Sequence, residues 1–178
     1  MLEKQVACNF NVTTTTSTGR VLDAAAALLG ICRERTYDGE PAMKLESAGA
    51  GGHPETWDLT FTTVNGCEVL SSRSLMQTAF EKMQAARGED ARMIYTIASS
   101  FQYNLARGIA QLALHAVERE GITTIALSGG VAYNYAIRET IRREIARENK
   151  DCIINDHYPL GDGCVSFGQC VYAGKLLE

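Results

Sequence analysis

One long periodic segment constrains the fold of this chain more than any other feature. Apolar residues recur at steps of three and four positions over residues 94–116, through more than six helical turns. Such spacing places them on one face of a helix, which must be buried along its length. The positions are Ile94, Ile97, Phe101, Leu105, Ile109, Leu112 and Ala116. The sequence therefore predicts a central packing helix around which the other elements gather.

The segments around this helix predict an α/β fold with a mixed sheet. Asn65 and Gly66 form the dipeptide most typical of a tight β-hairpin, and residues 122–127 and 152–155 are short apolar strands. Further helices are predicted after the hydroxyl-rich residues 13–19, which supply N-caps, and over residues 41–47 and 75–86, with a turn at 87–90. Between the late strands, Ile137, Ile141 and Ile145 mark one face of a helix. After them a last helix is predicted over residues 165–177, and its small residues permit close packing.

Glycines and polar side chains follow both late strands. Ser128, Gly129, Gly130 and Asn134 come after the first strand, and Gly161, Asp162 and Gly163 come after the second. In open α/β sheets ligands bind outside the carboxyl ends of the strands, and helix N-termini there favour anionic groups. The alternative is structural: Gly-Gly ends a strand and Asp162 serves only as a helix N-cap. No phosphate-loop or dinucleotide-binding glycine motif is present, so the residues leave both readings open.

Three further residues are candidates for a binding site. Asp23 interrupts a helix of otherwise small and apolar residues, so its carboxylate lies on the solvent face or is held for a ligand hydroxyl. Gly39 fits a turn, and Glu40 stands where a first-turn carboxylate favours the helix dipole.

Composition excludes several classes of function. The net charge of −4 provides no general attraction for nucleic acid, and no apolar run is long enough for a membrane helix. The N-terminus lacks the features of a signal peptide, which favours a cytoplasmic location. The six cysteines form no closely spaced pairs and are expected to be reduced, buried thiols. The three histidines are isolated, so neither a zinc site nor a hydrolytic triad is predicted from this chain alone.

Four ordered sequence blocks resemble the C-terminal part of the hydrogenase maturation carbamoyltransferases of the HypF family. The blocks are GRVLDAAAALLGICRERTYDGEPAMKLES, SSFQYNLARGIAQLA, IALSGGVAYN and GDGCVSFGQCVYAG. The resemblance implies the second lobe of an actin-like, ribonuclease H-like ATPase fold. It also implies binding of a carbamoyl adenylate, made from carbamoyl phosphate and ATP, and transfer of the carbamoyl group to the C-terminal cysteine of the partner HypE during nickel–iron hydrogenase maturation.

The resemblance assigns roles to individual residues. Gly19, Asp23, Gly39 and Glu40 would face the nucleotide ribose, and Gly129, Gly130 and Asn134 would contact its phosphate and base end. Asp162 would complete a divalent metal site, holding Fe, Zn or Mg, with two histidines from the other lobe. Gln102 stands where the family's motif has histidine.

The same resemblance implies that residues 1–178 are a single lobe, the C-terminal fragment of a larger carbamoyltransferase. The acylphosphatase, zinc-finger and carbamoyl-phosphate domains expected upstream are absent, and the fragment is expected to be inactive alone. Two alternatives remain: a lobe of a tRNA threonylcarbamoyladenosine synthesis enzyme, whose glycine motif is similar, and a non-catalytic α/β interaction lobe.

Overall fold

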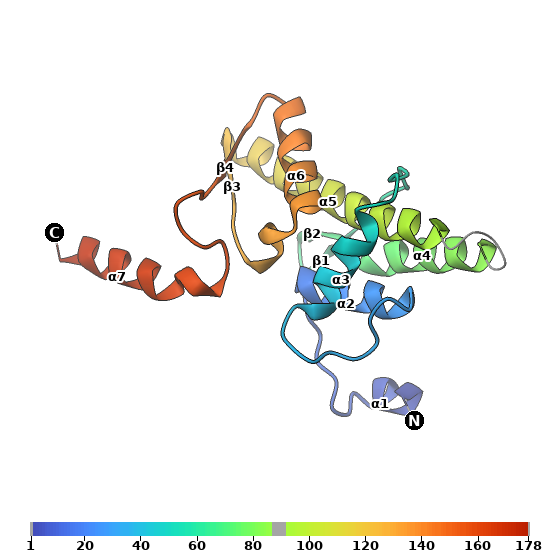
Figure 1. Ribbon diagram of the computed structural model, residues 1–178. Helices are drawn as coiled ribbons and strands as arrows, with labels where there is room; N and C mark the ends of the chain where they lie inside the picture. Colours follow the sequence, from blue (N-terminus) through green and yellow to red (C-terminus); the bar gives the residue numbers. More distant parts are fainter. Residues whose placement is uncertain (1, 87–91, 178) are drawn as a thin grey trace.

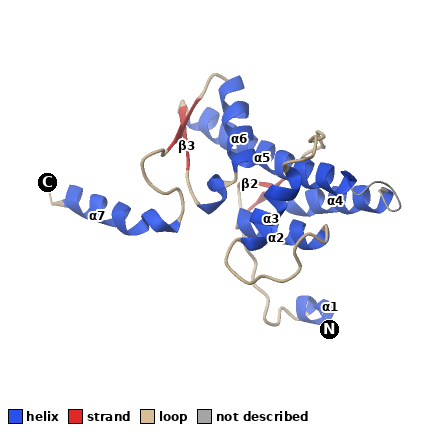
Figure 2. Cartoon of the chain, in the orientation of Figure 1, coloured by secondary structure: helices blue, strands red, loops and turns tan. Residues whose placement is uncertain are grey.

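The computed structural model describes residues 2–86 and 92–177 and has the predicted α/β character (Figure 1). The helices are α1 (Leu2–Ala7), α2 (Thr18–Leu28), α3 (Glu40–Gly49), α4 (Ser72–Ala85), α5 (Arg92–Glu120), α6 (Tyr135–Arg147) and α7 (Val165–Leu176), with 3-10 turns η1 (Gly130–Tyr133) and η2 (Asp162–Cys164). The strands are β1 (Phe61–Val64), β2 (Cys67–Leu70), β3 (Thr124–Leu127) and β4 (Asp151–Ile154). Helices predominate over strands (Figure 2). The turn predicted at 87–90 lies outside the described residues.

Helix α5 is the centre of the molecule, as its periodicity predicts. It contacts α3, α4 and α6, and Phe101 at its middle is fully buried. Burial is broader than a single face, because Ala98, Ala106 and Ala110 are also buried and their small side chains let neighbouring helices approach. Of the predicted apolar face, Ile97, Phe101 and Leu105 are buried, while Ile94 before them and the positions from Ile109 onward are partly exposed. Packing from several sides, rather than one buried stripe, therefore surrounds this helix.

Buried polar side chains on α5 hold a loop that has no regular structure of its own. Asn104 accepts a hydrogen bond from the Trp57 backbone N–H at 2.9 Å and donates one to the Glu55 carbonyl at 2.8 Å. Ser100 Oγ accepts from the Glu55 N–H at 2.9 Å. Because buried backbone groups need partners, these side chains fix the path between α3 and β1.

The strands form two separate ladders within the described residues. β1 and β2 are antiparallel, and Asn65 and Gly66 between them have φ values of 51° and 79°, as a tight hairpin turn of this kind requires. β3 and β4 are parallel, with Thr124 opposite Asp151. The prediction that the two glycine-containing turns follow neighbouring parallel strands is confirmed.

The predicted last helix is present as α7, but the close packing that its small residues permit is not observed among the described residues. Figure 1 shows α7 extending away from the rest of the molecule, and none of its residues is buried. A methyl group added at Gly168 or Gly174 would meet no atom within 4 Å. The stack of Phe167 on Tyr158, with ring centroids 4.3 Å apart, is the aromatic contact that links α7 to the preceding loop.

Two smaller predictions also need correction. Ser17 occupies the N-cap position of α2, but its hydroxyl makes no capping bond, and the Ser17 N–H instead donates to Thr15 Oγ1 at 3.1 Å. Of the six cysteines, which are all free as expected, Cys32 is buried, whereas Cys8, Cys67 and Cys170 are exposed. Their sequence neighbours are apolar or small, but the elements that carry them, notably α7, are not covered.

Candidate functional site

A cleft of about 700 Å³ lies beyond the carboxyl ends of β3 and β4, between the helix pair α2–α3 and the turns η1 and η2. Six of the eight residues to which the family resemblance assigns a role line it: Gly19, Asp23, Gly39, Gly130, Asn134 and Asp162. These residues come from four separate parts of the chain. Gly129 and Glu40 do not line the cleft.

The two glycines of the loop after β3 have different tasks. Gly129 has φ +102° and ψ 165°, a conformation that is essentially restricted to glycine, and its N–H donates to the Leu160 carbonyl at 2.7 Å. Gly129 therefore turns the chain and ties it to the segment after β4. Gly130 begins η1 and lines the cleft, where the absence of a side chain leaves the backbone accessible. Gly129 thus fits the structural reading of the Gly-Gly turn, whereas Gly130 lies at the cleft, where the ligand-binding reading expects it.

Asp23 presents an unusual carboxylate to the cleft. Its Oδ2 forms an ion pair with Arg20 at 3.0 Å, one helical turn earlier. Its Oδ1 is buried and has no hydrogen-bond partner. A buried acceptor without a partner costs roughly 1–3 kcal/mol, so an oxygen retained in this state suits a ligand donor. The solvent-face alternative for Asp23 does not describe this geometry.

Three other predicted residues shape the cleft by their positions. Gly19 lies in the first turn of α2, and Gly39, with φ +80°, is the left-handed residue that precedes α3. Asp162 is the first residue of η2, but the N-cap positions of η2 and of α7 are taken by Gly161 and Cys164, and the Asp162 side chain is exposed at the cleft. The structural reading of Asp162 as only an N-cap therefore does not hold.

Glu40 has a structural environment away from the cleft. It is buried in the first turn of α3, where Oε2 accepts from the Thr36 N–H at 2.6 Å and Oε1 pairs with Lys44 at 2.7 Å. The hydrogen bond from Lys44, together with those from Thr36, lowers the pKa of Glu40 from 4.5 to about 2. This geometry agrees with the helix-dipole reading of Glu40 and does not bring its carboxylate to the ribose position that the family resemblance implies.

The Glu40 carboxylate makes stability depend on acidity. Because its pKa is lower in the folded chain, its contribution is present above about pH 4.5 and is lost as the pH falls towards 2. Glu40→Gln should therefore lower the free energy of unfolding near neutral pH, and the difference from the parent should shrink near pH 3. Urea unfolding at both pH values measures this. Glu34→Gln, an exposed control in the segment before α3, should follow the parent; a constant deficit for Glu40→Gln would contradict the linkage.

Sequence reasoning missed several polar residues that line the cleft. Arg20, Asp38 and Glu46 are among them, together with Tyr133. Arg20 lies three positions before Asp23 on the same helix, so helical periodicity applied to polar residues could have found it. Glu46 accepts a hydrogen bond from the Tyr135 N–H at 2.7 Å across 89 residues of sequence, and no local signal predicts that contact.

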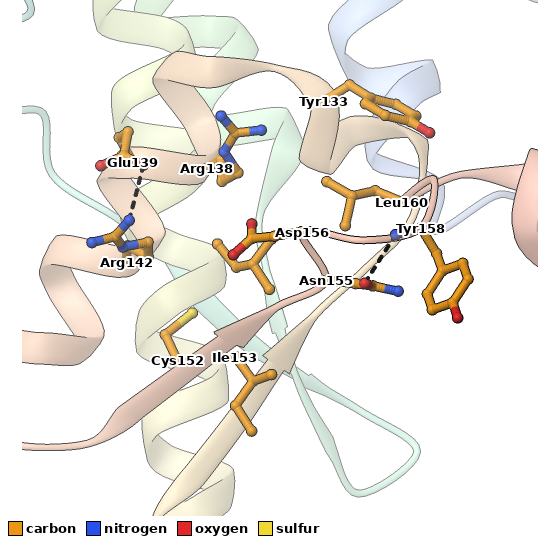
Figure 3. Close-up of a pocket in the computed structure, with 11 residues that line it drawn as sticks. Tyr133, Arg138, Glu139, Arg142, Cys152, Ile153, Asn155, Asp156, Tyr158 and Leu160 are labelled. Carbon is orange, nitrogen blue, oxygen red and sulfur yellow. Dashed lines mark hydrogen bonds and ion pairs between the residues drawn. The ribbon is translucent and has the colours of Figure 1, made fainter.

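A second hollow, of about 600 Å³, lies between α6 and β4 (Figure 3). Arg142 pairs with Glu139 at 3.5 Å, so these two charges largely offset one another. Burial raises the pKa of the Cys152 thiol, which disfavours the nucleophilic thiolate. Tyr133 lines both this hollow and the cleft. The second hollow therefore lacks the orphaned acceptor and the glycine-lined backbone that distinguish the cleft.

Metal binding by this chain alone has little support from its geometry. Within residues 2–86 and 92–177 no three His, Cys, Asp or Glu side chains are grouped as a metal site requires. Asp162 offers a single exposed carboxylate at the cleft, and a metal there would need ligands from outside the described residues.

Comparison with known proteins identifies the family. Residues 1–169 match the family described as "Carbamoyltransferase, Kae1-like Domain, second subdomain". The chain belongs to the HypF carbamoyltransferase family. It is 36% identical over 171 residues to a probable carbamoyltransferase HypF of Methanocaldococcus jannaschii, covering 96% of this chain and 21% of that protein. It is 28% identical to the carbamoyltransferase HypF of Rhodobacter capsulatus, covering 99% and 22%.

Solved HypF structures share the fold. The crystal structure of T. kodakarensis HypF matches with a TM-score of 0.81 at 36% identity, and a full-length HypF in the phosphate- and nucleotide-bound form matches with a TM-score of 0.85 at 26% identity. Each match covers 98% of this chain and 22% of the other, so the chain spans about a fifth of the HypF relatives it matches. The predicted second lobe of an actin-like fold is confirmed.

Two further observations accompany the family assignment. Among the described residues no helix has both the length and the apolar character needed to cross a bilayer. A tRNA N6-adenosine threonylcarbamoyltransferase of Prochlorococcus marinus is also similar, 26% identical and covering 90% of this chain and 44% of that protein.

Proposed function

We propose that this chain is the nucleotide-binding half of a cytoplasmic, ATP-dependent HypF-type carbamoyltransferase, and that its cleft holds a carbamoyl adenylate. The adenylate would form from carbamoyl phosphate and ATP, and its carbamoyl group would pass to the C-terminal cysteine of HypE. The observation that carries the proposal is the gathering of Gly19, Asp23, Gly39, Gly130, Asn134 and Asp162 around one cleft, which leaves the Asp23 Oδ1 buried without a donor.

The cleft residues suit the parts of an adenylate. Asp23 Oδ1 would accept a hydrogen bond from a ribose hydroxyl, which supplies the missing donor. Gly39 and Gly130 let the ligand approach the backbone closely because they have no side chains. The cleft volume of about 700 Å³ lies within the range of small-molecule sites, roughly 300–1,000 Å³. A relative described as nucleotide-bound supports the same ligand class.

Asp162 would supply one ligand to a divalent metal, Fe, Zn or Mg. Carboxylate oxygen is a ligand that each of these metals accepts, but the remaining ligands would have to come from the other lobe. A bound metal would act as a Lewis acid near the phosphate. Asp162 would then contribute negative charge and hold the metal at the edge of the cleft.

The uncovered helix α7 supports the proposal that this chain is one half of a larger site. Val171, Tyr172 and Leu176 are 46%, 68% and 69% exposed, although apolar helix surfaces of this kind are normally covered. Helix α7 follows directly after Asp162–Cys164, which borders the cleft. A first subdomain that packs on α7 would therefore contact this chain in the segment that follows the cleft residue Asp162.

The HypF reading is preferred to the tRNA-modifying relatives for two reasons. The chain is 36% identical to the HypF of M. jannaschii but 26% identical to the tRNA-modifying enzyme of P. marinus. The net charge of −4 also gives no basic field that would attract tRNA phosphates. The non-catalytic alternative leaves the orphaned carboxylate oxygen of Asp23 without an explanation.

The isolated chain is expected to transfer no carbamoyl group. With carbamoyl phosphate, ATP and HypE, the 178-residue chain should leave HypE unmodified, because it spans about a fifth of its HypF relatives and the proposed site also needs residues of the other lobe. The same chain assembled with the remaining polypeptide of a HypF relative should modify HypE, as intact-mass spectrometry would measure. Transfer by the chain alone would contradict the half-site proposal, and no transfer by an assembly that binds AMP would contradict the proposed reaction.

A further inference from the structure

Gln102 joins three elements behind the cleft. Its side chain is 1% exposed in the middle of α5. Gln102 Nε2 donates to the Leu45 carbonyl of α3 and to the Ala98 carbonyl of its own helix, each at 3.1 Å. Gln102 Oε1 accepts from Asn134 Nδ2 at 2.8 Å. The amide is therefore satisfied at both ends, and it connects α3 and α5 with the start of α6.

These contacts determine which way each amide points. Carbonyl oxygens can only accept, so the two carbonyls fix the nitrogen end of Gln102 towards them. The oxygen end must then face Asn134, which has to present its NH₂ group. Asn134 Oδ1 is consequently directed to the Ile137 N–H, at 3.0 Å, where it caps α6.

Asn134 connects this arrangement to the cleft. It ends η1 and caps α6, so its position sets where the loop that contains Gly130 stands. Asn134 lines the cleft. Gln102 instead lines a separate groove formed by α3, α5 and α6. Among the described residues Gln102 is the acceptor for Asn134 Nδ2, which leaves its second N–H available to a ligand.

We propose that Gln102 is a positioning residue for the cleft: through Asn134 it holds the Gly130 loop in place and makes Asn134 a hydrogen-bond donor towards a bound adenylate. The ligand group at Asn134 is then an acceptor, such as a phosphate oxygen or a base nitrogen. This inference rests on the proposed function for its ligand. The structural part of the inference, that Gln102 holds the Gly130 loop in place, does not depend on the proposed function.

Amide hydrogen exchange of the 178-residue chain tests the structural half. Gln102→Leu removes both donors and the acceptor, so exchange of the Ile137 amide should become about ten- to a hundredfold faster than in the parent. Asn104→Leu is the matched control, because it removes an equally buried amide from the same helix that bonds to Glu55 and Trp57 instead. Equal acceleration at Ile137 in both variants would overturn the proposal, since global destabilisation would then account for it.

AMP binding tests the ligand half in an assembly of this chain with the remaining polypeptide of a HypF relative. Gln102→Leu should raise the Kd for AMP at least about tenfold, whereas Asn104→Leu should change it less than about threefold. Gln102→His keeps one donor and one acceptor, so it should recover part of both losses.

The outcomes separate this inference from the proposed function. Faster Ile137 exchange with an unchanged AMP Kd in Gln102→Leu would overturn the positioning role. If the parent assembly does not bind AMP, the proposed function and the donor role of Asn134 both fail, while the exchange comparison still decides whether Gln102 holds the loop.

Discussion

Asp23→Ala is expected to weaken AMP binding by the assembled protein about ten- to a hundredfold, because a hydrogen bond to a charged acceptor would be lost from a buried site. The fold should not suffer equally. The substitution also removes an oxygen whose burial without a partner is unfavourable in the free chain. We therefore expect a melting temperature close to the parent value or above it, measured beside the Kd by calorimetry.

Asp58→Ala provides the charge-matched control for this prediction. Asp58 is exposed and lies outside the cleft, so its replacement changes the net charge equally without removing a buried oxygen. Its AMP Kd should stay within about threefold of the parent. Equal Kd values for Asp23→Ala and the parent would show that the buried Oδ1 has no ligand role.

Phe101→Ala should cause the largest loss of stability among single core substitutions, about 3–5 kcal/mol. Phe101 is fully buried at the middle of α5, and its ring meets the edge of Trp57 with centroids 6.5 Å apart. The substitution removes apolar burial, leaves a cavity and weakens the contact that seats the Trp57 loop on α5. Since domains are stable by only about 5–15 kcal/mol, much of the total would be lost. Urea unfolding near neutral pH measures the difference.

Phe80→Ala is the matched control, because Phe80 is 42% exposed on α4. Its replacement should cost less than about 1 kcal/mol, since much of its ring already contacts water. Similar costs for the two phenylalanines would contradict the central place of α5 in the core.

Local sequence patterns were sufficient wherever neighbouring residues determine the structure. The Asn65–Gly66 turn, the apolar face of α6 and the central position of α5 each follow from the spacing of residues a few positions apart. The glycine turns after β3 and β4 were also placed correctly at the ends of neighbouring parallel strands.

Long-range contacts were beyond this kind of reasoning. Gln102 and Asn134 are 32 positions apart, and Glu46 and Tyr135 are 89 apart, so no periodicity links them. Glu40 looked like a site residue from its motif, but Thr36 and Lys44 hold its carboxylate outside the cleft. The small residues of α7 predicted close packing, yet their partners are not among the described residues.

The sequence by itself determined the helices other than α1, which was not predicted, together with the hairpin, the parallel strand pair and the candidate residues of the site. These depend on backbone geometry and on side-chain spacing, which act over a few residues. Only the tertiary structure decided that six of those residues border one cleft, that Asp23 Oδ1 is left without a partner and that Gln102 orients Asn134. The reason is physical: hydrogen bonding and burial depend on which distant segments meet when the core closes around α5.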